Sequence, residues 1–434
     1  MEETFDVAII GAGPAGISAA CILADAGIKT IVLERGEYPG AKNVSGGVLY
    51  GHNLAEVIPD WLDHKCPIER NIVESRIWYL SKEGGYSIAC RDQAFSGDRK
   101  YNVFTVGRAK FDRWYADQAK KKGALVVHST VATNLLRDSK GNINGVLTSR
   151  AEGEIQAKVT ILADGINSPL AAQTSFRLDS KPENVALAVK EIIGIPSEII
   201  EQRFGVKDGN GITTEILGDI AGGMDAVGAL YTNKESISLC LGANLADFAR
   251  HKLKPYELIE TFKEHPMVAP LIADGKPSEY MAHWLPEGGY DTIPRLYGPG
   301  YLIAGDSAML FNTLHREGSN LAMASGKMAA ETVIEAFKRG DFSEASLAGY
   351  AARLASSYVM KDMKKYRRFN RFLYERKEIF NELPGLASFA AREILTVNGT
   401  GKKEKQRLIF KAIRQKLSLF RLLKLLWQGW RAVK

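Results

Sequence analysis

Residues 5–16 read Phe-Asp-Val-Ala-Ile-Ile-Gly-Ala-Gly-Pro-Ala-Gly, an apolar run that ends in a glycine-rich turn. The run is rich in β-branched residues, which is typical of a buried parallel strand. In the turn, Gly11 allows a tight bend, Gly13 lets the backbone approach a phosphate, and Gly16 permits close packing of a helix on the strand. Pro14 and Gly27 mark the start and the end of a helix over about residues 14–26. Together these features predict a dinucleotide-binding unit of the Rossmann type.

A second predicted strand, about residues 29–33, ends in Glu34, which lies 18 positions after Gly16. A carboxylate at this place accepts hydrogen bonds from the ribose hydroxyls of an ADP group. A glycine-rich turn without a ligand is the alternative, and the turn does not choose between FAD and NAD, since both contain ADP. We assign these residues to the ADP half of the cofactor: Gly11, Ala12, Gly13, Pro14, Ala15, Gly16, Glu34 and Arg35.

The composition is that of an ordinary globular protein, with 434 residues, 45% of them hydrophobic and 25% charged. The four cysteines form no C-x-x-C pair, so they indicate neither a zinc site nor an iron–sulfur cluster within the chain. Residues 7–24 are uncharged and long enough for a membrane helix, but their glycine-rich interruption favours a strand, a turn and a helix. We expect no signal peptide, because no basic segment precedes an apolar one at the N-terminus.

Later segments place polar residues at the ends of further elements. Apolar strands over residues 159–163 and 301–304 end in Asp164-Gly165 and Gly305-Asp306. Arg108 opens a predicted helix that continues towards Lys122, and Gly318-Ser319-Asn320 opens a longer one that ends near Phe337. Each segment alone has an ordinary explanation as a turn or a surface cation. Their joint order and spacing is the stronger observation.

In these segments the sequence resembles the glutathione-reductase-type flavoproteins, in the branch of aromatic hydroxylases, geranylgeranyl reductases and electron-transfer-flavoprotein:quinone oxidoreductases. The resemblance implies that the cofactor is FAD. Asp306 would bind its ribityl or pyrophosphate part, Arg108 would help to hold it, and Asp164 with Gly165 would form a second turn facing it. The helix that begins near Gly318 would point its N-terminus at the flavin. The partial positive charge there stabilises a negatively charged reduced flavin.

Four longer segments resemble the FixC-type electron-transfer-flavoprotein:quinone oxidoreductases: residues 39–47, 230–234, 265–271 and 314–323. The resemblance implies that electrons pass from an electron-transfer flavoprotein to membrane quinone. Larger relatives carry a four-cysteine cluster domain that this chain lacks, which implies a separate ferredoxin-like iron–sulfur partner. The rival predictions are a prenyl-lipid (geranylgeranyl) reductase and a non-catalytic flavin-binding subunit of a redox complex.

The same resemblance extends the list of expected site residues. Asn43, Ser45, Gly46 and Gly47 would lie close to the flavin ring, where glycine allows close backbone approach. Gly318, Ser319 and Asn320 would face it from the long helix. His315 and Glu317 are weak candidates for moving protons, and the alternative is that they hold the loop. Gly228 and Tyr231 are the expected quinone contacts.

The expected fold is α/β, with a Rossmann-like FAD-binding domain, an interleaved antiparallel-sheet domain for the substrate and a C-terminal helical region. We place the FAD-binding domain at residues 1–80, 105–175 and 295–340. The sheet domain takes residues 81–104 and 176–294, where residues 237–241 alternate apolar and small polar side chains. The helical region takes residues 341–434.

The C-terminal tail, residues 402–434, contains eleven Lys or Arg and one acid, whereas the formal charge of the whole chain is +7. On a helix, Arg407, Lys411, Arg414, Arg421, Lys424 and Arg431 form one stripe opposite an apolar face with Trp427 and Trp430. This pattern is typical of a helix in a membrane interface. Packing of the apolar face on the body or on a partner subunit is the alternative.

A second basic stretch, residues 361–377, contains interleaved aromatic side chains and is suited to an acidic ferredoxin or to lipid headgroups. No motif indicates binding of nucleic acid. These features predict a cytoplasmic protein that lies peripherally on the inner face of the cell membrane.

Overall fold

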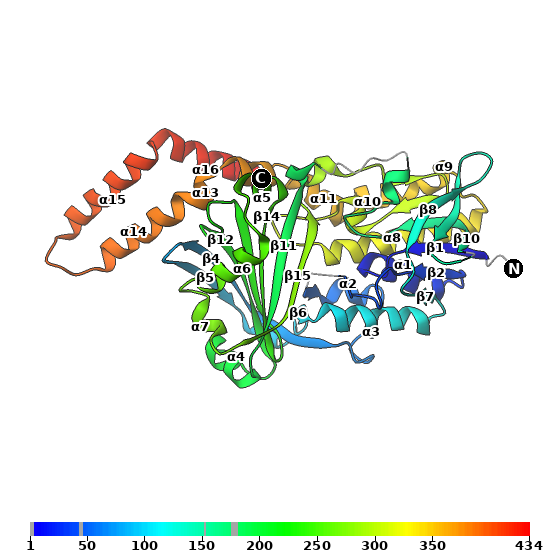
Figure 1. The fold of residues 1–434 in the computed structure, drawn as a ribbon, viewed down its shortest axis with the longest axis horizontal. Coiled ribbons are helices and arrows are strands. Elements are labelled where there is room, and N and C mark those ends of the chain that lie inside the picture. Colours follow the sequence, from blue (N-terminus) through cyan, green and yellow to red (C-terminus); the bar gives the residue numbers. More distant parts are fainter. Residues whose placement is uncertain (1–3, 43–46, 152, 175–180) are drawn as a thin grey trace. The chain divides into compact units, whose positions relative to one another are not determined.

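A computed structural model describes residues 4–42, 47–151, 153–174 and 181–434. The chain divides into two compact units. Unit 1 comprises residues 1–69, 102–185 and 284–365, and unit 2 comprises residues 70–101, 186–283 and 366–434. Figure 1 shows sheets and helices in both, which confirms the α/β class.

The sheet of unit 1 has the strand order β16-β17-β10-β1-β2-β7. Its parallel strands are β7 (Leu125–Val127), β2 (Thr30–Leu33), β1 (Thr4–Ile10), β10 (Glu154–Leu162) and β17 (Tyr301–Ile303). Strand β16 (Tyr297–Gly298) and the hairpin of β8 (Ala132–Arg137) and β9 (Ile143–Thr148) add antiparallel pairs. Most side chains of β1 and all those of β2 are buried, as expected for strands inside a parallel sheet.

The register of the parallel strands brings three turns to one edge of this sheet. Ile10 of β1 pairs with Leu162 of β10, and Leu162 pairs with Ile303 of β17. The turns that follow these strands begin at residues 11, 163 and 304. The carboxyl ends of parallel strands form the usual ligand-binding edge of such a sheet.

The helices of unit 1 include α1 (Pro14–Asp25), α3 (Arg108–Lys121) and the long α8 (Ser319–Arg339). Their bounds differ from the predicted ones by at most two residues. Shorter elements are α2 (Gly51–Ala55), α9 (Glu344–Leu347), α10 (Gly349–Ser356), α11 (Tyr358–Lys365) and the antiparallel pair β3 (Val48–Tyr50) and β6 (Val103–Val106). Figure 1 shows α1 beside α8, and the two helices pack at Gly326.

Unit 2 contains a sheet in the order β15-β11-β14-β13-β12-β4, with β5 paired to β4. The strands are β4 (Ile68–Ser81), β5 (Gly84–Arg91), β11 (Val185–Gly194), β12 (Asn210–Gly218), β13 (Ala226–Thr232), β14 (Ser236–Asn244) and β15 (Lys276–Pro286). The pairs β11–β14, β14–β13, β13–β12 and β4–β5 are antiparallel, and β12 runs parallel to β4.

One face of this sheet forms the core of unit 2. Side chains such as Trp78, Leu230 and Leu239 pack there with Phe204 and Phe262. Phe204 belongs to α4 (Ser197–Phe204) and Phe262 to α6 (Pro255–Lys263). The same face is covered by α5 (Leu245–His251), with the single turn α7 (Ala269–Ile272) nearby. The alternation of buried and partly exposed residues along β12 and β13 follows from the two faces of a strand.

The C-terminal helices of unit 2 are α12 (Phe369–Glu375), α13 (Glu378–Asn381), α14 (Leu383–Leu395), α15 (Lys402–Lys416) and α16 (Leu419–Val433). Helices α14 and α15 lie side by side as a hairpin (Figure 1). The buried Lys405 donates from Nζ to the main-chain oxygens of Glu393, at 2.9 Å, and of Thr396, which closes the turn between the two helices.

The single helical stripe expected for the tail is wrong, because the tail forms two helices. Leu417 has an extended backbone, and Ser418 caps α16 by accepting a hydrogen bond from the N–H of Arg421. A capped N-terminus starts a new helix with its own phase. Within the described parts of the chain, no helix combines the length and the apolar character needed to cross a membrane.

Substitution of Gly326 by alanine tests the contact between α1 and α8. A Cβ at this position would lie 2.0 Å from the main-chain oxygen of Ala15, so the helices must move apart. We expect a loss of about 1–3 kcal/mol in the free energy of unfolding, measured by urea denaturation of the purified chain. Gly385→Ala in α14 is the control, because its Cβ would meet no atom within 4 Å; equal losses in both variants would contradict this account.

Candidate functional site

The glycine-rich turn between β1 and α1 has two glycines that the protein itself requires and one that it does not. A Cβ at Gly11, where φ is +101°, would lie 2.3 Å from the oxygen of Ala163, and a Cβ at Gly16 would lie 2.0 Å from the oxygen of Gly11. Gly13 has an ordinary extended backbone, and its Cβ would meet nothing within 4 Å. The open space beside Gly13, at the N-terminus of α1, fits the close approach of a phosphate group.

Glu34 closes this turn from the end of β2. Its Oε2 accepts from the N–H of Ala12 at 3.0 Å, and its Oε1 accepts from the N–H of Gly36 at 2.6 Å. A carboxylate has about four acceptor positions, so these two bonds leave room for a ribose hydroxyl. The neighbouring Arg35 is exposed.

The turn after β10 holds a buried carboxylate. Asp164 Oδ1 accepts from the hydroxyls of Ser168, at 2.7 Å, and Ser307, at 3.1 Å. The other oxygen, Oδ2, is buried and has no hydrogen-bond partner among the residues that the structure describes. Burial raises the pKa of Asp164. Gly165, with φ +80°, leaves open space where a Cβ would point.

Asp306 follows β17 in the third turn, next to Gly305, whose φ is +67°. Burial raises the pKa of Asp306 to about 6, against the attraction of Arg108. Arg108 is itself buried and binds Asp112 through Nε and Nη2, both at 2.9 Å. The structure therefore places Arg108 inside unit 1 at the start of α3, and its charge acts on Asp306.

The loop before α8 concentrates polar atoms that lack partners. Asn312 and Glu317 form an isolated antiparallel bridge, with N–H···O distances of 2.9 and 3.2 Å. Within and beside this loop, four buried atoms have no hydrogen-bond partner in the part of the chain that the structure describes: Asn312 Nδ2, Thr313 Oγ1, Arg316 Nε and Asn320 Oδ1. Buried polar groups in native proteins are nearly always paired. This mixed set of donors and acceptors fits the mixed C=O and N–H edge of a flavin ring.

The first residues of α8 complete this part of the site. Gly318 is the N-cap and offers no side-chain cap, and Ser319 and Asn320 open the helix. The N–H groups of a helix's first turn have no intrahelical partners, so they are available to a ligand. Asn320 also hydrogen-bonds the carboxyl group of Glu317 through its side chain.

His315 and Glu317 differ in their surroundings. His315 is exposed, whereas Glu317 is half-buried. Burial raises the pKa of Glu317, helped by the charge of Asp362 and opposed by Asn320 and His315. The main-chain bridge to Asn312 and the side-chain bond from Asn320 tie Glu317 into the loop; proton movement by either residue stays a prediction.

Residues 43–47 were expected near the flavin. Asn43, Ser45 and Gly46 lie outside the described residues. Gly47 is described, and its carbonyl accepts from the N–H of Val106 at 2.7 Å. This bond ties the segment to β6 within unit 1.

The two expected quinone contacts, Gly228 and Tyr231, lie on strand β13 of unit 2. A Cβ at Gly228 would face Ile216 and Ile220, which belong to the helix-covered core. Tyr231, an odd number of residues further along β13, faces the other side and hydrogen-bonds Cys240. Tyr231 therefore lies off the core face, and contact of either residue with quinone stays a prediction.

Sequence reasoning did not assign Asn312, Thr313 and Arg316. Arg316 has a φ of +57°, which lies in the left-handed region. Glycine or asparagine usually occupies this region. The adjacent Glu317 and Gly318 were the only usable signals for a tight loop here.

Asp306→Asn separates the stability of the apoprotein from its ability to hold cofactor. The folded pKa, about 6, lies above the unfolded value near 3.8, so wild type gains stability as pH falls from about 7 to 4. At pH 7.5 we expect the variant apoprotein to be more stable by up to about 3 kcal/mol, with the difference vanishing near pH 4. The same variant should retain less FAD, measured by the absorbance ratio of flavin to protein. A less stable variant at every pH would contradict this reading.

Comparisons with known proteins agree with this geometry. Residues 6–167 match the family described as FAD dependent oxidoreductase. A geranylgeranyl bacteriochlorophyll reductase-like protein from Thermoplasma acidophilum has a similar structure, with a TM-score of 0.74 at 20% identity over 98% of this chain and 100% of the other. The flavin-dependent brominase Bmp2 gives 0.66 at 14% identity over 98% and 93%. At these identities the structures show a shared fold only; together with the matched family, they make FAD the cofactor.

Closer relatives are found among sequences. Residues 369–434 match the ETF-QO/FixC family C-terminal domain. The chain is 44% identical to protein FixC of Azotobacter vinelandii over 100% of both chains. It is 42% identical to FixC of Rhizobium meliloti over 93% of both, and 38% identical to FixC of Escherichia coli K12 over 94% and 95%. The chain therefore belongs to the FixC family of FAD-dependent oxidoreductases.

Proposed function

We propose that this protein passes electrons from an electron-transfer flavoprotein, through FAD, to a membrane quinone. The observation that carries the proposal is the match of residues 369–434 to the ETF-QO/FixC C-terminal domain, together with full-length similarity to FixC. In the name of that domain, ETF-QO stands for the electron-transfer-flavoprotein:quinone oxidoreductases. A separate ferredoxin-like protein is part of the proposal, because the four cysteines of this chain are unpaired and spread over both units.

The residues of unit 1 would bind and orient the cofactor. The α1 N-terminus and Glu34 would hold the ADP half, with Ala12 fixed by Glu34 at 3.0 Å. Asp164 and Asp306, at the ends of β10 and β17, would accept hydrogen bonds from hydroxyl groups in the middle of the FAD molecule. The α8 N-terminus would face the flavin, which when bound exchanges electrons with donor and acceptor.

The C-terminal helices support contact with a membrane. On α16, Leu425 and Ala432 are buried and Gly429 lies against Phe372 of α12, so one side of this helix packs on unit 2. A different side is apolar and exposed: Phe420, Leu423, Leu426, Trp427 and Trp430 are 53–77% exposed. Exposed apolar surface of this extent marks an interaction site.

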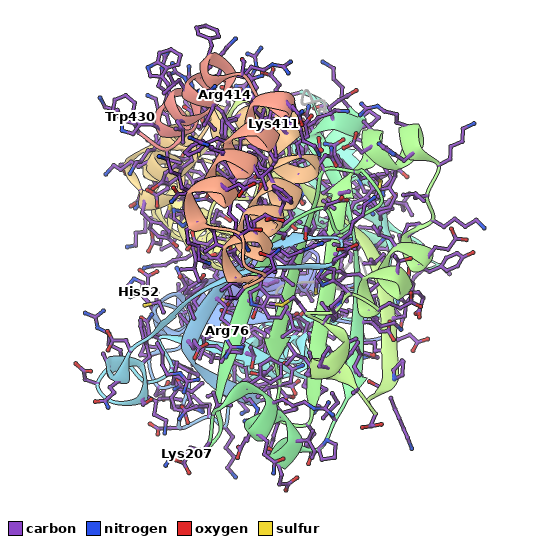
Figure 2. The ribbon with its side chains drawn as sticks, turned by 90° about the vertical axis from the view of Figure 1, so that its left-hand side faces the viewer. His52, Arg76, Lys207, Lys411, Arg414 and Trp430 are labelled. Carbon is purple, nitrogen blue, oxygen red and sulfur yellow. The ribbon has the colours of Figure 1, made fainter. Side chains whose placement is uncertain are left out.

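Cations border the exposed apolar side. Arg431 lies over the ring of Trp427 at 4.7 Å, and Lys434 over that of Trp430 at 4.5 Å. On α15, Lys411 and Arg414 are also exposed, and Figure 2 shows them with Trp430 on the two tail helices. Aromatic side chains with neighbouring cations suit the headgroup region of a bilayer, and each cation near anionic lipid contributes about 1 kcal/mol.

The proposed activity has a direct test. Purified protein loaded with FAD is combined with reduced electron-transfer flavoprotein and the ferredoxin-like protein, and reduction of a soluble quinone analogue is followed. We expect turnover that depends on all the components. Turnover of geranylgeranyl lipid without quinone reduction would favour the prenyl reductase, to which the similarity with the Thermoplasma acidophilum structure draws attention. No turnover of either would favour a non-catalytic subunit.

Membrane binding is tested with vesicles that contain anionic lipid. The double variant Trp427→Ala/Trp430→Ala removes the two exposed indoles of α16, and we expect its partition to vesicles, measured by co-sedimentation, to fall at least about tenfold. Trp284→Ala is the control, because Trp284 is 40% exposed but lies outside the tail. Unchanged vesicle binding with a loss of binding to a partner subunit would assign this surface to that partner instead.

A further inference from the structure

Arg316 occupies an unusual place in the loop before α8. Its φ of +57° lies in the left-handed region, which is costly for a residue with a long side chain. The bridge between Asn312 and Glu317 encloses this residue, and Asn312 Oδ1 also accepts from the N–H of His315 at 3.4 Å. The surrounding loop thus holds Arg316 in a conformation that the residue itself disfavours. Such a conformation persists only where the surrounding structure over-determines it.

The guanidinium group of Arg316 has no counter-ion among the described residues. Among the residues that the structure describes, it forms neither an ion pair nor a hydrogen bond, and its Nε is buried. The adjacent Glu317 does not neutralise it, because the Glu317 carboxyl group is bound by Asn320 and interacts with His315 and Asp362. A partly buried cation whose Nε also lacks a hydrogen-bond partner among the described residues is suited to pair with a negative group of a ligand.

The surroundings of Arg316 indicate what kind of group that is. Asn312, Thr313 and Asn320 are each at least 94% buried and each has a side-chain atom without a partner. They lie in the same loop and at the start of α8, whose free N–H groups add further donors. A flat, delocalised anion with both C=O and N–H groups at its edge satisfies all of these side chains. The α1 turn, with its open space at Gly13, already provides the place for phosphate.

We propose that Arg316 recognises the reduced flavin and sets its reduction potential. Oxidised FAD takes up two electrons and one proton and then has a negative charge on the pyrimidine side of its ring. A guanidinium beside that side stabilises the reduced form relative to the oxidised form, which raises the potential. Arginine suits this role because its planar group presents several donors and remains charged.

This inference depends on the FAD cofactor and not on the proposed donor and acceptor. It holds whether the electrons come from an electron-transfer flavoprotein or from another reductant. Its test measures an equilibrium of the flavin itself, so its failure is distinct from failure of the quinone assay.

The test compares Arg316→Gly and Arg316→Lys with wild type, all purified with FAD. Glycine adopts φ +57° without strain, so Arg316→Gly removes the charge while the loop keeps its path. The two-electron midpoint potential is measured against reference dyes during reduction by dithionite. We expect Arg316→Gly to lower it by at least about 30 mV, which corresponds to a tenfold weaker preference for the reduced form. Arg316→Lys should keep most of the wild-type value.

A second readout and a matched control complete the design. Sulfite adds to oxidised flavin and leaves a similar negative charge on the ring, so its affinity should fall at least about tenfold in Arg316→Gly. The control is Lys327→Met, since Lys327 is a cation of α8 that is already paired with Glu56 at 2.8 Å; its potential should match wild type. Wild-type potential and sulfite affinity in Arg316→Gly would overturn the proposal, and so would an equal shift in Lys327→Met.

Discussion

Unit 1 depends on backbone atoms approaching one another at distances that only glycine allows. Gly11 lies against Ala163, Gly16 lies against Gly11, and Gly326 lies against Ala15, each so close that a Cβ would fall 2.0–2.3 Å from a main-chain oxygen. These contacts fix the ends of β1 and β10 and the spacing of α1 and α8. The strand register then brings Asp164 and Gly305 to the same edge. The candidate cofactor site, made of three turns that are distant in sequence, follows from this packing.

Much of this frame could be predicted because its signals are local. The apolar run, the glycine spacing and Pro14 gave β1 and α1 to within one residue, and the α/β class followed. The tail shows the limit: no glycine or proline marks the break between α15 and α16, which lies at the extended Leu417 and the cap Ser418. The position of Tyr231 off the core face depends on strand phase, which the sequence of β13 alone left open. The αL backbone of Arg316 is imposed by its loop, so no residue preference could indicate it.

Several residues of the candidate site have features that suit a ligand but lower the stability of the folded protein alone. Asp306 has a raised pKa from burial, Asp164 keeps one unpaired oxygen, and Arg316 holds a disfavoured backbone. Each of these features costs stability in the protein alone. The parallel sheet and the packed helices α1 and α8 over-determine the positions of these residues, so the fold tolerates the cost. A ligand that supplies the missing partners recovers it, because binding to the folded state alone shifts the unfolding equilibrium.

The exposed side of α16 is a feature of the same kind on the surface: it costs free energy in the isolated chain. Its packed side already satisfies Leu425 and Gly429 against unit 2, so Trp427 and Trp430 are not needed for folding of this helix. These two indoles are more than half exposed and lie beneath Arg431 and Lys434, which supports the proposed contact with a surface that is apolar within and negatively charged at its edge. An anionic bilayer has both properties, and it is also where a quinone dissolves. The unpaired polar groups around Arg316 and the exposed indoles of α16 are alike in one respect. Each costs free energy in the isolated chain, and binding of a suitable partner would remove that cost.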